Sequence, residues 1–227
     1  MTSALPPYKQ AFLETCIKAQ ILTFGEFTLK SGRKSPYFFQ AGNFSSTHLL
    51  SAITTAYAET LTTNPVPEFD VLFGPAYKGI PLASGTALKL YELAPEKYAH
   101  VGYAFNRKEA KAHGEGGNMV GMSMKGKRVL VVDDVMTAGT AMREAVEIIK
   151  REGGVLVGVV VCLDRMEMKV LPEEGGSGLS TVQEIERELE VPVYSILTLD
   201  DLISGVDDQE KVAKMEEYRK VYAAKKQ

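Results

Sequence analysis

Apolar residues gather in short continuous runs along the second half of the chain, and segments of helical periodicity lie between several of them. Runs without period-two alternation are typical of strands that are covered on both faces. The pattern predicts such strands at residues 69–75, 99–105, 128–134, 155–163 and 191–199. Helices are predicted at residues 79–92 and 139–152, and a capping box at Thr181–Glu184 predicts a third that leads into the last strand. This alternation predicts an α/β fold with a mostly parallel central sheet flanked by helices.

The first 65 residues follow a different pattern. A helix near residues 7–20 precedes two short strands near 25–30 and 35–40, and a second helix follows near 46–61. We expect residues 1–65 to form most of a small N-terminal hood at one edge of the sheet. Residues 66–205 would then be the α/β core of a single domain that spans residues 1–227. The charged tail from Asp208 to Gln227 predicts a solvated C-terminal helix.

The composition of the chain limits the kinds of molecule that the protein is expected to bind. The 227 residues are 45% hydrophobic and 24% charged, with a net charge of −3, so no global positive field attracts nucleic acid or anionic lipid. The run at 155–163 is too short to cross a membrane as a helix. Two cysteines, Cys16 and Cys162, are too few for a disulfide framework, and the N-terminus has no signal-peptide pattern. We expect a cytoplasmic protein without nucleic-acid or membrane partners.

The third strand of the core carries the strongest chemical signal. It ends in Asp133 and Asp134, and the small, hydroxyl-bearing segment Thr137–Ala141 follows at the start of a helix. A helix N-terminus binds phosphate, and carboxylates accept hydrogen bonds from sugar hydroxyls. Both features fit one ligand if that ligand is a sugar phosphate. A capped turn that binds nothing is the alternative, because acids at strand ends often serve only in turns.

The same stretch resembles a known family. The residues "VLVVDDVMTAGTA", 129–141, match the thirteen-residue phosphoribosyl pyrophosphate signature of the type I phosphoribosyltransferases at every position. Three further stretches resemble the orotate phosphoribosyltransferase family: "FTLKSGRKSPYFFQAG" at 27–42, "GPAYKGIPLA" at 74–83 and "NRKEAKAHGEGG" at 106–117. The last of these is similar to the mobile catalytic loop of that family. The likeness extends from about residue 24 to residue 165.

The resemblance implies roles for individual residues. For phosphoribosyl pyrophosphate it implies Lys30, Tyr77, Lys78, Arg107, Lys108, Lys111, His113, Asp133, Asp134, Val135, Met136, Thr137, Ala138, Gly139, Thr140 and Ala141. For orotate it implies Phe38, Phe39, Thr137 and Arg165, and for catalysis Lys111, His113, Arg107 and Lys108. Without the resemblance, Phe38 and Phe39 fit core aromatics better, and Arg165 fits a surface pair with Asp164. Arg33 and Lys34 inherit no role and are interpreted as surface charges.

The implied reaction is the transfer of ribose 5-phosphate from phosphoribosyl pyrophosphate to N1 of orotate, which gives orotidine 5′-monophosphate and pyrophosphate in UMP biosynthesis. The resemblance also implies Mg²⁺, held mainly by ligand oxygens and water rather than by a direct protein ligand. It implies a homodimer in which the mobile loop reaches the neighbouring subunit's site.

Rival functions have weaker support in the sequence. A regulatory nucleic-acid-binding relative would need a basic face or a helix-turn-helix pattern, and neither is evident. A purine phosphoribosyltransferase does not fit "SPYFFQAG", and an oxidoreductase would need G-x-G-x-x-G after the first strand. The spacing G-x-x-x-x-G-K at 121–127 precedes a strand and lacks the following Ser or Thr, so it is not an ATPase phosphate loop.

Overall fold

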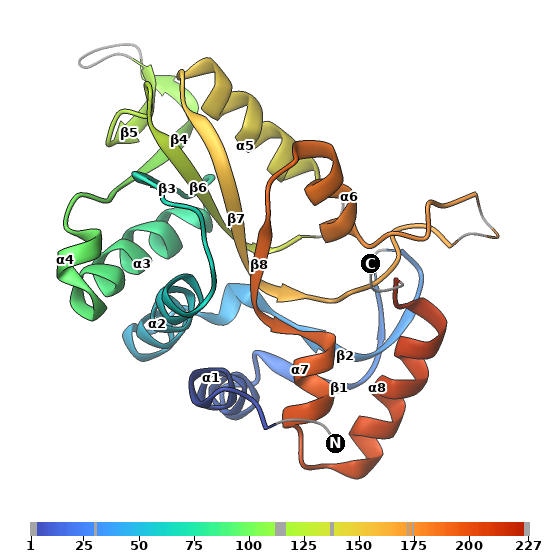
Figure 1. The fold of residues 1–227 in the computed structure, drawn as a ribbon. Coiled ribbons are helices and arrows are strands. Elements are labelled where there is room, and N and C mark those ends of the chain that lie inside the picture. The colour runs from blue at the N-terminus through green and yellow to red at the C-terminus, as the bar shows by residue number, and fades with distance from the viewer. Residues whose placement is uncertain are drawn as a thin grey trace.

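The computed structural model describes residues 4–29, 31–111, 117–136, 139–171, 173 and 175–224, with the backbone alone at 110, 111 and 117. Its centre is a six-stranded sheet in the order β5-β4-β3-β6-β7-β8 (Figure 1). The strands are β3 (Val71–Phe73), β4 (Gly102–Lys111), β5 (Gly117–Gly121), β6 (Arg128–Val135), β7 (Val155–Asp164) and β8 (Val193–Thr198). All neighbours pair in parallel except β5, which is antiparallel to β4. The predicted mostly parallel α/β fold is confirmed.

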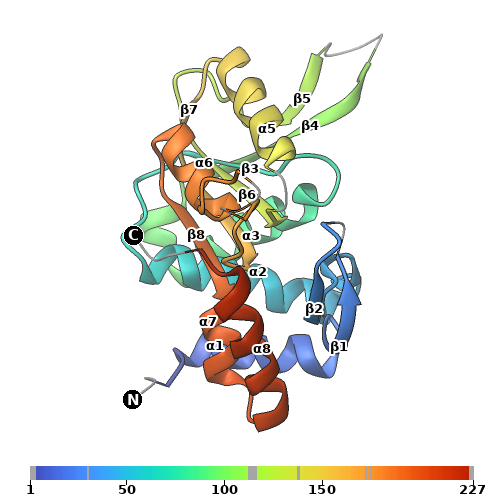
Figure 2. The ribbon, with the colours of Figure 1, turned by 90° about the vertical axis from the view of Figure 1, so that its right-hand side faces the viewer.

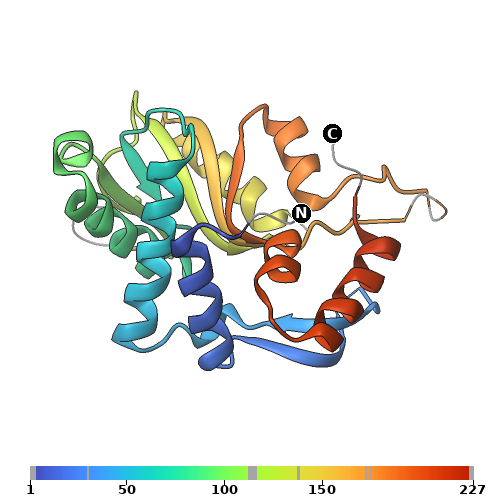
Figure 3. The same cartoon turned by 60° about the horizontal axis from the view of Figure 1, so that its bottom comes forward.

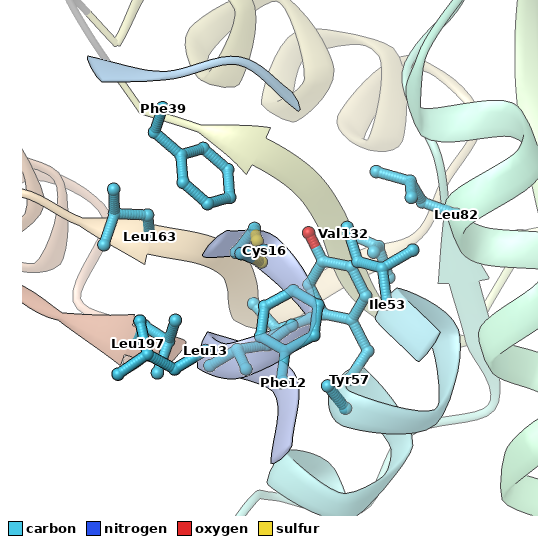
Figure 4. Packing of buried hydrophobic residues seen from close by; sticks show 14 of the residues in the cluster. Phe12, Leu13, Cys16, Phe39, Ile53, Tyr57, Leu82, Val132, Leu163 and Leu197 are labelled. Carbon is cyan, nitrogen blue, oxygen red and sulfur yellow. The ribbon is translucent and has the colours of Figure 1, made fainter. Parts of the chain in front are cut away.

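Successive side chains of the central strands pack into two separate hydrophobic clusters, one on each face of the sheet. Leu130 and Val132 of β6 join a cluster with α1 (Pro7–Lys18), α2 (Thr47–Thr63) and α3 (Gly79–Leu93), part of which Figure 4 shows. Val129 and Val131 face the other way, toward α5 (Thr140–Arg151) and α6 (Thr181–Leu189). Because strand side chains alternate between faces, a sheet covered on both sides requires the continuous apolar runs seen in the sequence.

The N-terminal segment adds a second, smaller sheet. Strands β1 (Leu22–Thr28) and β2 (Lys34–Phe39) form an antiparallel hairpin, followed by a 3₁₀ turn at Ala41–Asn43 and by α2. Figure 2 shows this hairpin and the β4–β5 hairpin projecting on the same side of the main sheet. Helices α7 (Leu199–Gly205) and α8 (Gln209–Tyr222) lie over the β1–β2 hairpin in Figure 3, and α8 contacts β2. The C-terminal helices therefore pack against the N-terminal segment.

Several predicted elements differ from the structure. Residues 106–111 belong to β4 rather than to a loop, and β5 pairs with them, because an edge strand can be held by backbone hydrogen bonds without an apolar sequence. The capping box of α6 is formed by Ser180 and Gln183, not by Thr181. The expected C-terminal helix is present as α8 and most of its residues are exposed or half-buried, but it is not solvated on all sides, because Met215 and Tyr218 are buried. Helices α4 (Pro95–Tyr98) and α7 were not predicted.

Candidate active site

The turn between β6 and α5 has the backbone that an anion site needs. Gly139 precedes the first residue of α5 and adopts the left-handed conformation with φ of 75°, which L side chains rarely take. A Cβ at this position would also crowd Arg143 and Ile185. No side chain among the described residues caps the start of α5, so its first amide groups are available to a ligand. Val135 and Met136 pack against the two cores, whereas Thr137 and Ala138 lie outside the described residues.

The two carboxylates at the end of β6 are held in defined positions. Asp133 accepts a hydrogen bond at Oδ1 from the backbone N–H of Asp134 at 2.9 Å. Asp134 in turn accepts one at Oδ1 from the N–H of Val135 at 2.7 Å, and its Oδ2 lies 2.7 Å from Nζ of Lys78. The hydroxyl of Tyr57 donates to the carbonyl of Asp133 at 2.7 Å, which ties α2 to this strand end. Both aspartates thus reach the same edge of the sheet.

Asp133 lies in an environment that disfavours its charge. Burial, with the neighbouring charge of Asp134 as the next cause, raises its pKa to about 6. The folded protein therefore keeps a proton on Asp133 over a range of pH in which the unfolded chain has already lost it. This carboxyl group with its raised pKa lies at the predicted ligand site, and perturbed pKa values are common at functional sites.

The raised pKa of Asp133 predicts how stability varies with pH. Between an unfolded pKa near 3.8 and the folded value of about 6, the native state binds the extra proton. The free energy of unfolding of the ligand-free protein should therefore fall as the pH rises through this window, by about 1 kcal/mol from pH 5 to pH 7. Urea unfolding at several pH values measures this slope. Asp133→Asn should flatten it, and a variant slope equal to that of the wild type would contradict the assignment.

A second turn brings Lys78 to the aspartates. Gly74 ends the β3 segment and packs directly on Gly79 at the start of α3, where a Cβ on either glycine would collide with the backbone. The amide of Ala76 donates to Oδ1 of Asn106 at 2.9 Å, and the Ala76–Tyr77 peptide bond is cis. Asn106 is buried on β4 and was not identified as a site residue from the sequence. The signal available in the sequence was an amide residue directly before the cationic segment that begins at Arg107.

A cavity of about 210 Å³ opens beside the ion pair between Lys78 and Asp134. Its walls are mostly apolar and come from the 3₁₀ turn after β2, from α2 and from α3. Tyr77, which precedes Lys78, is 71% exposed. The cavity therefore joins an apolar wall to a charged end, as a site for a flat ring linked to a sugar phosphate requires.

The cationic residues predicted for catalysis lie on or beyond β4. Arg107 and Lys108 are strand residues, and Nζ of Lys108 lies 3.9 Å from a carboxylate oxygen of Glu144 on α5. The backbone of Lys111 ends β4, but its side chain lies outside the described residues, as does the whole of His113. The hairpin thus directs part of the basic segment toward the helix that begins at the phosphate turn.

The residues predicted for orotate are only partly brought together. Phe38 is 38% exposed and its ring lies 5.6 Å from that of Phe27, whereas Phe39 is buried and points into the core cluster in Figure 4. Adjacent strand residues face opposite sides, so only Phe38 presents its ring to solvent. Arg165 follows β7 and pairs with Glu167 rather than with Asp164, so the alternative of a surface pair with Asp164 was wrong. Lys30 lies outside the described residues.

Comparisons with known proteins show which family this chain resembles. A sequence profile described as a phosphoribosyl transferase domain matches residues 45–196. An orotate phosphoribosyltransferase of Neurospora crassa is 52% identical, covering 98% of this chain and 99% of its own. That of Metarhizium anisopliae is 49% identical, with 99% of both chains covered. The crystal structure of orotate phosphoribosyltransferase from Francisella tularensis is similar with a TM-score of 0.79 and 37% identity, covering 94% of this chain and 99% of that one.

The profile match, the sheet and the aspartate-bearing turn together define a phosphoribosyltransferase, an enzyme that transfers a sugar phosphate group. Since the relatives match over nearly the whole of both chains, the chain belongs to the orotate phosphoribosyltransferase family. Within the described ranges, no helix has both the length and the apolar character needed to cross a bilayer. The described residues also bring together no group of three His, Cys, Asp or Glu side chains that could hold a metal ion.

Proposed function

We propose that this chain transfers ribose 5-phosphate from phosphoribosyl pyrophosphate to N1 of orotate, releasing pyrophosphate, as a step of UMP biosynthesis. The single observation that carries the proposal is the meeting of three groups at the end of β6. They are the paired carboxylates of Asp133 and Asp134, the open start of α5 after Gly139, and the ammonium of Lys78. Full-length relatives named for orotate and the phosphoribosyl group support the choice of substrates.

The donor would bind along this strand end. The 5-phosphate takes the amides and hydroxyls of the turn through Ala141, while the carboxylates accept hydrogen bonds from the ribose hydroxyls. Lys78 meets the pyrophosphate as a point charge, which requires it to leave Asp134. Tyr77, exposed next to it, lies along the same part of the donor. Lys30, Thr137 and Ala138 keep their predicted roles here.

Orotate would bind on the side of the β1–β2 hairpin. Phe38 offers a ring face to the flat pyrimidine, and Phe39 supports the strand from the core. Arg165 offers a guanidinium to the orotate carboxylate, a pairing with two matching planes. Thr137 completes the predicted set. The two substrates would then meet between β2 and the end of β6.

Catalysis would consist of positioning and charge stabilisation. As the bond from the anomeric carbon to pyrophosphate breaks, positive charge develops on the ribose and negative charge on the leaving group. Lys78 and the basic segment of Arg107, Lys108, Lys111 and His113 stabilise the departing charge. Asp133 and Asp134 hold the ribose in place throughout.

The donor set at the site fits Mg²⁺ held mostly by substrate oxygens. Asp133 and Asp134 are the carboxylates within reach, and Asp134 is already paired with Lys78. When bound, the ion would neutralise charge on the leaving pyrophosphate. This chain's contribution is to hold the ribose hydroxyls and the pyrophosphate in a fixed relation to each other.

We also propose a cytoplasmic homodimer, with the segment after β4 reaching the partner's site. The two cysteines, Cys16 and Cys162, are buried and free, which suits a reducing compartment. Helix α3 exposes Leu88 and Tyr91 one turn apart on the same face, a short row of two apolar side chains suited to a subunit contact.

The dimer proposal can be tested at this row. Leu88→Glu combined with Tyr91→Glu should shift the sedimentation coefficient from that of a dimer to that of a monomer of half the mass, because charges are excluded from such interfaces. Val155→Glu, at an exposed apolar residue that begins β7, is the matched control. A wild-type protein that sediments as a monomer would end the proposal.

Activity is tested by following orotate consumption spectrophotometrically with phosphoribosyl pyrophosphate and Mg²⁺. Turnover with orotate, none with adenine or hypoxanthine, and loss of turnover on chelation by EDTA are the expected results. Turnover with a purine base in place of orotate would exclude the proposed acceptor. Turnover that survives chelation would exclude the metal.

A further inference from the structure

Arg165 is held from three sides at the end of β7. Its Nε donates to a carboxylate oxygen of Glu167 at 2.7 Å, and its Nη2 donates to Oγ of Ser35 at 3.1 Å. Its guanidinium carbon lies 4.5 Å from the centre of the Tyr37 ring. Among the residues that the structure describes, none accepts a well-aligned hydrogen bond from Nη1, although the buried hydroxyl of Tyr218 lies beside both Arg165 and Glu167. The guanidinium is thus fixed on one edge and has a donor left on the other.

Glu167 is shared between two cations. Besides Arg165, its carboxylate lies 4.0 Å from Nη1 of Arg33, and the side chains of Glu167 and Arg33 are only 13% and 11% exposed. Arg33 also donates to the carbonyl of Met168 at 2.6 Å and stacks on Tyr222 at 5.0 Å. The interpretation of Arg33 as a surface charge was therefore wrong, because contacts with residues 135 positions away bury it.

The end of α8 holds the segment that carries Glu167. The N–H of Met168 donates to the carbonyl of Tyr222 at 2.8 Å, and the N–H of Ala224 donates to the carbonyl of Met166 at 2.9 Å. These bonds flank an antiparallel bridge between Glu167 and Ala223. Glu167 is thus fixed through its backbone by the C-terminal helix and through its side chain by two arginines.

Burying these three charged side chains is unfavourable for the free energy of folding, which suggests that the cluster has a functional role. Removing three charges from water carries a desolvation penalty that well-packed apolar residues would avoid. However, Nε and Nη2 on one edge of Arg165 lie 2.7 Å and 2.6 Å from the same oxygen of Glu167, and this pairing fixes the direction in which the opposite edge points. Ser35 adds a link to β2, the strand that carries Phe38, because its hydroxyl also donates to the carbonyl of Tyr37 at 2.7 Å.

We propose that Glu167, fixed by the end of α8, is a positioning residue that aims the free edge of Arg165 at the carboxylate of the acceptor. The proposal rests on the proposed function, since it takes Arg165 as the orotate contact. It gives the C-terminal helix a part in acceptor recognition.

The test uses steady-state kinetics of the full-length enzyme. Glu167→Gln keeps the size and one acceptor but removes the charge that orients Arg165. We expect the KM for orotate to rise about tenfold, since small misplacement of a binding group is costly. The Kd of phosphoribosyl pyrophosphate, measured by calorimetry, should stay within about twofold of wild type, because the donor is held at the end of β6. An unchanged or lower KM for orotate would overturn the proposal.

A double-mutant cycle separates positioning from a general structural role. In an Arg165→Lys background, Glu167→Gln should change the KM for orotate by no more than about twofold, because its effect passes through the guanidinium. An effect of full size in that background would refute the link. If Arg165→Lys alone leaves the KM unchanged, the assignment of Arg165 to orotate fails, and this proposal with it. Turnover of orotate by the wild type would still stand.

Controls cover the loss of a buried charge and failure to fold. Asp201→Asn breaks the similarly buried pair of Lys9 and Asp201, and should lower the melting temperature without raising the KM for orotate. If Glu167→Gln does not fold, Glu167→Asp keeps the charge but shortens its reach, and should raise that KM about threefold. An unchanged KM in Glu167→Asp would then overturn the proposal.

Discussion

Replacing Lys111 with alanine is expected to lower kcat about 10²- to 10³-fold, which is comparable to the loss of one preorganised group that stabilises charge in the transition state. Lys111 ends β4, the strand that also carries Arg107 and Lys108. In the proposed mechanism the positive charge of Lys111 meets negative charge that grows on pyrophosphate only as the bond breaks. The loss should therefore appear in kcat more than in the Kd of the donor.

Single-turnover measurements check this expectation, because they separate the chemical step from product release. Lys34→Ala is the matched control: it removes the same charge from an exposed lysine that pairs with Glu26 on the β1–β2 hairpin. Its kcat should stay within about twofold of wild type, as is usual for an exposed pair. A Lys111→Ala enzyme with the kcat of the wild type would remove Lys111 from the mechanism.

The second large effect is expected at the end of β6. Asp133→Asn together with Asp134→Asn should weaken the binding of phosphoribosyl pyrophosphate about 100-fold. Two charge-assisted hydrogen bonds to the ribose hydroxyls are replaced by neutral ones, and each of the former contributes about 1.5–3 kcal/mol. The opposite result is physically possible, because removing two negative charges lowers repulsion of an anion. Tighter binding by the variant would therefore refute the ribose assignment.

The same double substitution should leave the folded protein as stable as before or more stable. Burial already disfavours the charge on Asp133, so a neutral side chain of the same shape relieves that cost. Calorimetry should then show weaker binding of the donor, whereas urea unfolding at pH 7 should show no loss of stability. Asp70→Asn is the control, because Asp70 pairs with Arg128 at the other end of the strands. It should lower stability and leave donor affinity unchanged.

The central strands and the phosphate turn could be predicted because their signals are local. A continuous apolar run identifies a strand covered on both faces, and two acids followed by small residues identify the turn at its end. The assignment of both Phe38 and Phe39 to the acceptor came from the family resemblance and stays a prediction, whereas the orientations of the two rings follow from a local rule. Consecutive strand residues face opposite sides, which sends Phe39 into the core and leaves Phe38 at the surface.

What could not be predicted depends on contacts between distant segments. The cluster of Arg33, Glu167 and Arg165 joins the β1–β2 hairpin to the end of β7, and α8 completes it from the far end of the chain. No periodic pattern in the sequence predicts that these three residues come together. The β4–β5 hairpin was missed because its polar sequence resembles a loop, and only pairing along the sheet edge makes it a strand.

The ion pair of Lys78 and Asp134 affects how the donor first encounters the enzyme. At 2.7 Å the two charges largely neutralise each other, so this end of the pocket attracts an approaching polyanion only weakly at long range. The net charge of −3 on the whole protein adds no attraction. We expect the cationic strand β4 to supply the electrostatic steering, because Lys108 is held less closely by Glu144, at 3.9 Å, than Lys78 is by Asp134. Neutralising Arg107 or Lys108 should therefore lower the association rate of the donor, and added salt should lower it as well. Lys78 acts only after the donor has bound.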